Sequence, residues 1–312
     1  MAIMALAGLA AAVAQSVPVK IALPVGELAG TYVPGNTGGP VVVIVPGSGP
    51  TDRDGNSTPL VKAAPYRMLA DALKLRGIGS IRFDKRGLFE SKSVLARPDQ
   101  VTIADYAADV HRWAAKASAL AAAKCAWVAG HSEGALVALA AAQDRKGICG
   151  VISIAGPGRK LGLILLDQLQ SNPANAPILP QALNALDTLE HGGSVDEQSL
   201  PAPLRPLFKA SLQPYLRDLL SYDPATLASR LRVPFLVLQG DKDIQVSIAD
   251  AQSLAKAKPN ASLDILPNTN HVLKEVTSAD RTANIATYSD PDRPLARGVA
   301  DRMTSFITAH AP

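Results

Sequence analysis

Cysteine, aromatic residues and charge are all scarce in this sequence of 312 residues. It has two cysteines, Cys125 and Cys149, and neither has the Cys or His partners that a metal site needs. Aromatic residues make up 4% and charged residues 19%, and the Lys and Arg residues are scattered along the chain. Without a basic stripe or a stacking platform, the net charge of +4 does not indicate a nucleic-acid partner.

Long apolar runs are also missing, except at the N-terminus. Residues 1–13 are almost wholly apolar, and Ala12-Val13-Ala14 gives the small-x-small pattern of a cleavage site. The run is shorter than the ~18 residues that span a bilayer, and no other stretch is a transmembrane candidate. We expect residues 1–14 to be the remainder of a truncated secretory signal peptide and the protein to be exported, periplasmic or secreted. The alternative is an ordinary apolar helix.

Export bears on the two cysteines, because disulfides form in oxidising compartments. Each cysteine begins one of two successive predicted strands, and such strands are often neighbours. The sequence leaves both a disulfide and a pair of buried thiols open.

Hydrophobic residues make up 47% of the chain and fall into alternating strand and helix patterns. After a predicted strand pair at 17–23 and 28–33, the strands are 41–45, 80–84, 125–129, 150–156, 233–239 and 262–266. The expected helices are 66–73, 102–118, 135–142, 247–256 and 295–307. Because these strands are apolar without alternation, we predict an α/β fold whose mostly parallel sheet is covered by helices on both faces.

One segment breaks this alternation. Residues 157–222 contain leucine-rich helical patches separated by proline and glycine pairs, and no strand pattern. We expect a helical cap or lid at 157–222, inserted into a core formed by residues 17–156 and 223–312.

The motif Gly130-His131-Ser132-Glu133-Gly134 lies between a predicted strand and a predicted helix. A Gly-x-Ser-x-Gly in this position is typical of a nucleophile elbow, in which a tight turn exposes the serine hydroxyl. The three fixed residues recur by chance in about one chain in ten of this length, so the context must decide.

A serine nucleophile needs a base and a carboxylate that orients the base. Of five histidines, only His271 lies in a loop after a core strand that follows Ser132. Two acids, Asp241 and Asp243, follow the strand that ends at Gln239, and spacing alone does not separate them. The amide of Glu133, directly after the nucleophile, is one candidate donor for an oxyanion hole.

Four further motifs carry a resemblance to a known family. They are Gly47-Ser48-Gly49-Pro50-Thr51-Asp52-Arg53-Asp54-Gly55, Asp84-Lys85-Arg86-Gly87, Gly240-x-x-Asp243-x-x-Val246 and Asn270-His271-x-Leu273-Lys274. Together with the elbow they resemble the α/β-hydrolase superfamily, specifically its bacterial serine esterases. The resemblance runs from about Val17 to the end, apart from the insertion.

The resemblance implies the α/β-hydrolase fold and selects Asp243 as the acid, with Asp241 as the alternative. It also implies that the amide of Ser48 is the second oxyanion donor, with Gly49 as the alternative.

The chain departs from the family pattern at Pro46, where a histidine is usual, and at Phe89, where a glycine is usual. We expect Phe89 either to narrow the pocket or to pack. The acidic and basic run at 52–54 is expected to form a turn held by side-chain hydrogen bonds rather than a rim of the site, and Arg86 to have a structural role.

These observations predict a serine carboxylic-ester hydrolase that forms an acyl-enzyme with Ser132, His271 and Asp243. We expect a small-molecule ester substrate, no metal or organic cofactor, no nucleic-acid partner and no stable membrane insertion. The alternatives are a thioesterase or peptidase with the same triad, and a catalytically silent hydrolase fold that binds a ligand.

Overall fold

The computed structural model of the chain describes residues 16–57, 59–94 and 101–312. The signal peptide predicted at residues 1–14 lies outside these ranges. Within them, no helix has the length and apolar character needed to cross a membrane.

Eight strands form one sheet in the order β1-β2-β4-β3-β5-β6-β7-β8. The first strand pairs antiparallel with the second and the second antiparallel with the fourth, while the other neighbours are parallel. The predicted α/β fold with a mostly parallel sheet is therefore confirmed. The strands are β1 Val17–Ala22, β2 Glu27–Val33, β3 Val41–Val45, β4 Gly79–Phe83, β5 Ala126–His131, β6 Ile148–Ile154, β7 Phe235–Gly240 and β8 Ser262–Leu266.

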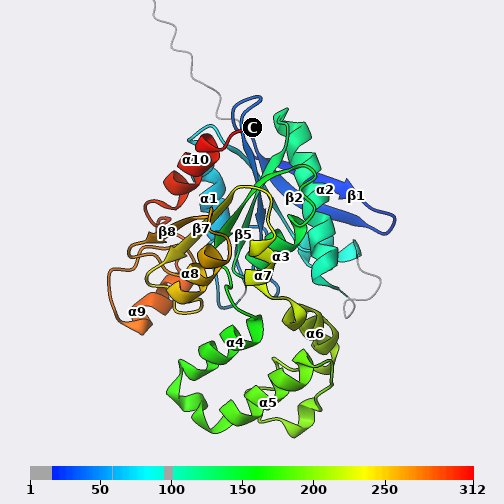
Figure 1. Ribbon diagram of the computed structural model, residues 1–312, viewed down its shortest axis with the longest axis vertical. Coiled ribbons are helices and arrows are strands. Elements are labelled where there is room, and N and C mark those ends of the chain that lie inside the picture. The colour runs from blue at the N-terminus through cyan, green and yellow to red at the C-terminus, as the bar shows by residue number, and fades with distance from the viewer. Residues whose placement is uncertain (1–15, 58, 95–100) are drawn as a thin grey trace, which may run out of the picture.

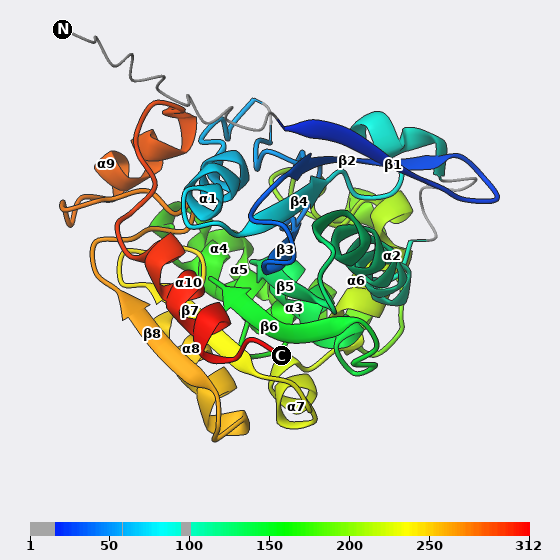
Figure 2. The same ribbon diagram turned by 90° about the horizontal axis from the view of Figure 1, so that it is seen from above.

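Helices cover both faces of the sheet, which explains why β3 is apolar at every position (Figure 2). Val41, Val43 and Val45 belong to the core on one face, and Val42 and Ile44 to the core on the other. The first face is covered by α2 Ile103–Ala121, α3 Glu133–Ala141, α7 Pro224–Ser229 and α8 Ile248–Ala257, and the second by α1 Pro65–Lys74 and α10 Val299–Ala309. A short helix, α9 Arg281–Ala286, lies in the loop region between β8 and α10.

Two of these helices begin at a capping box. The Thr102 side chain accepts a hydrogen bond from the Asp105 amide, and the Asp105 carboxylate accepts one from the Thr102 amide. Ser247 and Asp250 repeat this arrangement at the start of α8. Such reciprocal bonds satisfy amides that have no partner within the helix and fix where it begins.

The segment between β6 and the second half of the core is helical. It contains α4 Leu161–Gln170, α5 Leu179–Glu190 and α6 Gln213–Ser221, with short 3-10 segments and no strand among its residues, all of which the structure describes. Figure 1 shows these three helices gathered below the sheet, away from the C-terminus.

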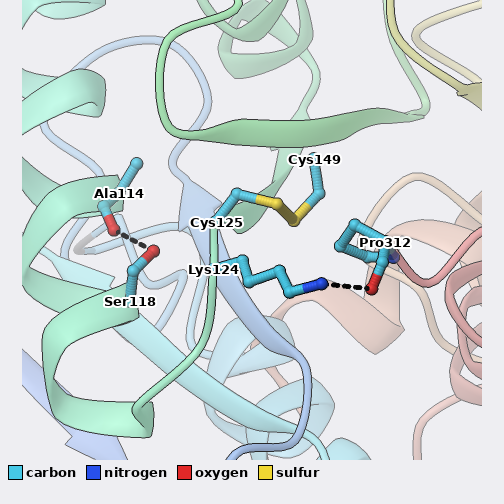
Figure 3. The surroundings of a disulfide bond; sticks show 6 residues. All are labelled: Ala114, Ser118, Lys124, Cys125, Cys149 and Pro312. Carbon is cyan, nitrogen blue, oxygen red and sulfur yellow. Dashed lines mark hydrogen bonds between the residues drawn. A yellow bond between two sulfur atoms is a disulfide. The ribbon is translucent and has the colours of Figure 1, made fainter.

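A disulfide joins Cys125 and Cys149, with their Cα atoms 5.4 Å apart (Figure 3). Cys125 directly precedes β5 and Cys149 is the second residue of the neighbouring β6. Of the two possibilities left open by the sequence, the structure therefore has the disulfide. It lies at the edge where the two strands begin, opposite the edge where β5 ends beside Ser132.

Candidate active site

Ser132 occupies a sharp turn between β5 and α3. Its backbone has φ 54° and ψ −125°, a conformation that non-glycine residues adopt only when the surrounding fold enforces it. A Cβ atom on Gly130 would lie 2.1 Å from the carbonyl oxygen of Gly134, and one on Gly134 would lie 2.3 Å from that of Val45. Both glycines of the motif are thus required by close backbone contacts, and the turn is a nucleophile elbow in its geometry.

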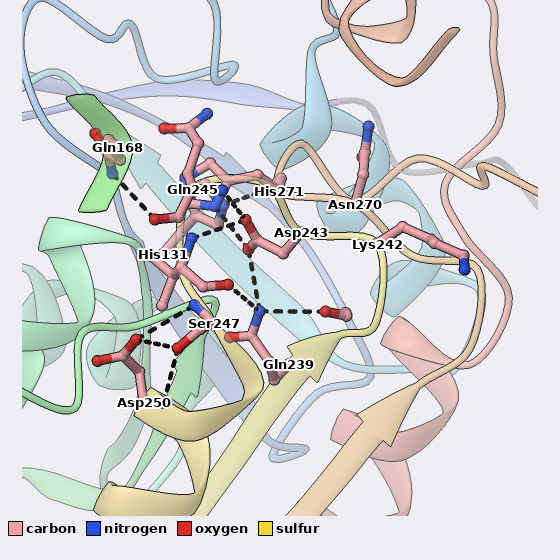
Figure 4. Close-up of polar contacts among 12 residues, drawn as sticks. His131, Gln168, Gln239, Lys242, Asp243, Gln245, Ser247, Asp250, Asn270 and His271 are labelled. Atoms are coloured by element: carbon pink, nitrogen blue, oxygen red, sulfur yellow. Dashed lines mark hydrogen bonds and ion pairs between the residues drawn. The ribbon is translucent and has the colours of Figure 1, made fainter. Parts of the chain in front are cut away.

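The predicted base and one predicted acid are in direct contact. His271 Nδ1 lies 2.8 Å from Asp243 Oδ2, and both side chains are buried (Figure 4). Asp243 Oδ1 accepts hydrogen bonds from the amides of Gln245 at 2.8 Å and Val246 at 3.0 Å. Burial raises the pKa of Asp243, but His271 and these amides outweigh burial and hold the pKa below its ordinary value. Asp243 is therefore an anion at neutral pH and fixes the orientation of the imidazole.

Asp241, the alternative acid, is exposed, and its amide donates to the carbonyl of Leu266. The geometry brings Asp243 to His271 and leaves Asp241 at the surface.

The loop that carries His271 is fixed by its neighbour. The buried Asn270 side chain donates to Asn284 at 3.0 Å and to Thr287 at 2.7 Å, and it accepts a hydrogen bond from the Lys274 amide. The short helix α9 and the 3-10 segment Thr287–Ser289 that follows it thereby brace the histidine loop.

A cavity of about 270 Å³ brings the predicted residues together. Ser132, His271, Ser48 and Glu133 all line it, whereas Gly49 does not. Its apolar wall includes residues from the start of the inserted segment: Pro157, Leu161, Ile164 and Leu165. Gln168, Gln245 and Tyr288 add polar groups.

The two predicted oxyanion donors belong to two different segments that line the cavity. Glu133 is the first residue of α3, so its amide lies at the positive end of the helix and has no acceptor within it. Ser48 follows β3, and its carbonyl accepts a hydrogen bond from the Thr51 hydroxyl at 2.8 Å.

Lys85 supports the loop that carries Ser48, a role that sequence reasoning missed. Its buried ammonium donates to the carbonyl of Gly47 at 2.7 Å and lies 3.5 Å from Glu133 Oε1. The loop is thus held from the segment that follows the neighbouring strand β4, although Pro46 replaces the histidine implied by the resemblance. The only signal was the Asp84–Gly87 motif at the end of that strand.

Gln239, Tyr66 and His131 also escaped prediction as site residues. Gln239 Nε2 donates to Asp243 Oδ2 at 3.1 Å, and Tyr66 and His131 line the cavity. Gln239 and His131 are buried polar residues at the ends of apolar strands, and that position is a signal that could have identified them.

The polar run at 52–54 has a structural role, as expected. Asp52 Oδ1 accepts from the amides of Asp54 at 2.9 Å and Asn56 at 2.8 Å, which is a turn held by side-chain hydrogen bonds. Arg86 likewise donates two hydrogen bonds of 2.7 Å to Asp109 in α2.

Of the two expectations for Phe89, a narrowing of the pocket is wrong. The residue is 42% exposed and does not line the cavity. Phe89 begins a 3-10 helix, Phe89–Val94, with φ 46°, a backbone conformation that favours the glycine implied by the resemblance at this position.

Within residues 16–57, 59–94 and 101–312, no three His, Cys, Asp or Glu side chains are grouped to hold a metal ion.

Comparison with known proteins shows the family and the fold of the chain. Residues 42–284 match the alpha/beta hydrolase family. The chain belongs to the alpha/beta hydrolase family. Within this family it is 29% identical over 275 residues to esterase EstD of Thermotoga maritima, covering 83% of this chain and 58% of that protein. The chain therefore matches little more than half the length of this relative.

Solved alpha/beta hydrolase structures share the fold over nearly the whole chain. The alpha/beta hydrolase GrgF from Penicillium sp. sh18 superposes with a TM-score of 0.61 and 18% identity, covering 95% of this chain and 99% of that one. A proline iminopeptidase from Mycobacterium smegmatis has a TM-score of 0.60 and 14% identity, covering 94% and 98%. At these identities the likeness concerns the fold alone.

Proposed function

We propose that this alpha/beta hydrolase is a serine carboxylesterase. The observation that carries the proposal is the contact of His271 Nδ1 with Asp243 Oδ2 at 2.8 Å beside a cavity that Ser132 also lines. The similarity to an esterase of Thermotoga maritima supports ester hydrolysis over other reactions of the fold.

In the proposed mechanism, Ser132 Oγ attacks the ester carbonyl carbon while His271 Nε2 takes the hydroxyl proton. Asp243 holds the imidazole with Nε2 free to accept that proton and stabilises the imidazolium that forms. The proton then passes to the leaving alcohol as the C–O bond breaks, which leaves an acyl-serine. Water repeats the two steps, releases the carboxylic acid and restores the serine.

The negative charge that develops on the carbonyl oxygen is assigned to the amides of Ser48 and Glu133. Backbone donors fixed before the reaction need no reorganisation when the charge appears, and the loss of one such donor typically costs about 10²–10³ in kcat.

The cavity favours a small, uncharged acyl group. Its volume of about 270 Å³ lies near the lower end of ligand pockets, and its wall towards the inserted helices is aliphatic. An apolar acyl chain against Leu161, Ile164 and Leu165 replaces water there and is stabilised by about 0.8 kcal/mol per buried methylene.

A panel of aryl esters of increasing acyl length, assayed beside one thioester and one peptide substrate, tests this function. We expect turnover of short-chain esters above that of the other two classes, and none by Ser132→Ala. Preference for the thioester or the peptide would replace the carboxylesterase by a thioesterase or peptidase. Absence of all turnover by folded protein would favour a ligand-binding protein.

The proposal includes export to the periplasm or the medium. The apolar stretch at residues 1–14 and the Cys125–Cys149 disulfide support an oxidising compartment. Fractionation of the source cells should recover the protein outside the cytoplasm with this disulfide formed, and recovery in the cytoplasm with free thiols would contradict export.

A further inference from the structure

His131, which directly precedes Ser132 in the elbow motif, links the elbow to helix α1 and to the loop that carries His271. Its Nε2 atom lies 2.7 Å from the carbonyl oxygen of His271, and its Nδ1 atom lies 2.8 Å from the hydroxyl of Tyr66. That hydroxyl in turn accepts a hydrogen bond of 3.1 Å from the amide of Gly47. A buried chain of hydrogen bonds therefore runs from the loop of Ser48, through α1 and the elbow, to the loop of the base.

We propose that His131 is a positioning residue that, with Tyr66, holds the oxyanion loop and the His271 loop in register with Ser132. The inference rests on the proposed function, since it assigns these two side chains a task within the same site. Neither touches the reacting atoms in the proposed mechanism.

The chemistry of the groups fixes the direction of every bond in the chain. The His271 carbonyl can only accept, so His131 Nε2 carries a proton and donates it there. In the neutral ring Nδ1 is then unprotonated and accepts the proton of the Tyr66 hydroxyl, whose oxygen accepts from the Gly47 amide. The neutral Nε2–H tautomer of His131 therefore satisfies all the partners, and a second ring proton on Nδ1 would remove the acceptor that the Tyr66 hydroxyl uses.

Neutrality matters because His131 also packs against the base. The two imidazole rings are 4.8 Å apart between centroids, and Tyr66 meets His131 edge-on at 5.4 Å. A charged His131 would repel the imidazolium that His271 forms during each acyl transfer. Burial, with a smaller contribution from His271, lowers the pKa of His131 to about 3, so the ring remains neutral where esterases work.

The loops that carry Ser48 and His271 keep other hydrogen bonds when the bonds through Tyr66 and His131 are lost. Lys85 still donates to the Gly47 carbonyl, and Asn270 still braces the base loop. Loss of the chain should therefore displace the catalytic groups slightly without unfolding the site, and displacements of about 1 Å can cost about 10²-fold in rate.

The test compares Tyr66→Phe, His131→Leu, His131→Gln and the double variant Tyr66→Phe/His131→Leu. Esterase kcat is measured per active site, counted by titration with a fluorophosphonate. We expect kcat to fall about 10-fold in Tyr66→Phe and about 100-fold in His131→Leu, with KM changed less than about threefold. His131→Gln should recover part of the loss, because its amide offers both an acceptor and a donor.

The double variant should be no slower than His131→Leu, because His131→Leu already interrupts the series of hydrogen bonds. Losses of kcat from two residues of one hydrogen-bond network are not additive. Tyr32→Phe, at a buried tyrosine in β2 outside the cavity, is the matched control and should keep the parent kcat. A parent-like kcat per titrated site in both Tyr66→Phe and His131→Leu, or losses that appear only as fewer titrated sites, would overturn the positioning role.

A second measurement is independent of turnover. ¹⁵N NMR of histidine-labelled protein at pH 7 should show His131 as the Nε2–H tautomer, with an Nδ1 resonance that shifts in Tyr66→Phe. The opposite tautomer, or a charged ring, would overturn the proposal even if the protein hydrolyses esters. If the protein hydrolyses no ester, the proposed function fails, and this spectrum still decides whether the hydrogen-bond chain exists.

Discussion

At the scale of single residues, two aspartates of one loop have very different surroundings. The Asp243 carboxylate accepts hydrogen bonds from the imidazole of His271 and from two backbone amides, whereas Asp241 is exposed. Asp243→Asn should lower kcat by about 10⁴, the typical cost of losing the acid of a triad, and Asp241→Asn should leave kcat within about threefold. Steady-state kinetics of both variants check this, and the reverse ranking would move the acid to Asp241.

His131 makes the stability of the fold depend on pH. Its pKa of about 3 in the folded protein lies below the ordinary value of about 6.5, so the unfolded chain binds the proton more readily. Its contribution is fully present above about pH 6.5 and is lost as the pH falls towards about 3. Tyr66, His271 and Asp243 interact with the His131 ring. All three are present in both the parent and His131→Leu, so a difference between the two pH profiles reports on His131.

Urea unfolding of the parent and of His131→Leu at several pH values tests this dependence. Between about pH 6 and pH 4 the parent should lose up to about 1.4 kcal/mol more per pH unit than the variant. Parallel profiles would mean that His131 is not the group that titrates.

At the scale of elements, the elbow depends on backbone contacts that only glycine allows. Gly130→Ala would place a methyl group 2.1 Å from the Gly134 carbonyl, so we expect a loss of more than about 3 kcal/mol in unfolding free energy, or failure to fold. Gly147→Ala is the control, because Gly147 has φ 74° but no heavy atom near the added methyl, and should cost about 1–2 kcal/mol. Equal costs by thermal or urea unfolding would contradict this account of the elbow.

The elements themselves were largely predictable. β3 and β8 have their predicted bounds, and the start of α2 follows from Thr102 because capping is a local interaction. The helix after the elbow begins at Glu133, two residues before the predicted 135, because the tight turn leads directly into helical backbone.

The site was predictable where it depends on chain order and not where it depends on packing. Ser132, His271 and Asp243 follow from a motif, an order and a resemblance. Lys85, after β4, and Tyr66, in α1, contact the same loop, and no local pattern reveals such contacts between distant segments. The path of the inserted helices was unpredictable for the same reason.

In the whole molecule, the disulfide and the candidate active site lie at opposite edges of the sheet. The disulfide joins residues separated by 24 positions where β5 and β6 begin, and the candidate site lies where they end. The double variant Cys125→Ser/Cys149→Ser should therefore lose about 3 kcal/mol of unfolding free energy, chiefly through a less restricted unfolded chain, and keep its kcat at 25 °C. Denaturant unfolding measures the loss of unfolding free energy, and ester kinetics measure whether kcat is kept. A large fall in kcat without unfolding would show that the two edges are coupled.

The proposed mechanism requires Ser132 to be an activated nucleophile. The most direct test is to treat the folded protein with a fluorophosphonate and locate the adduct by peptide mass spectrometry. We expect stoichiometric labelling at Ser132, strongly slowed labelling in His271→Ala, and none at that position in Ser132→Ala. Folded protein that remains unlabelled, or is labelled at another residue, would contradict it.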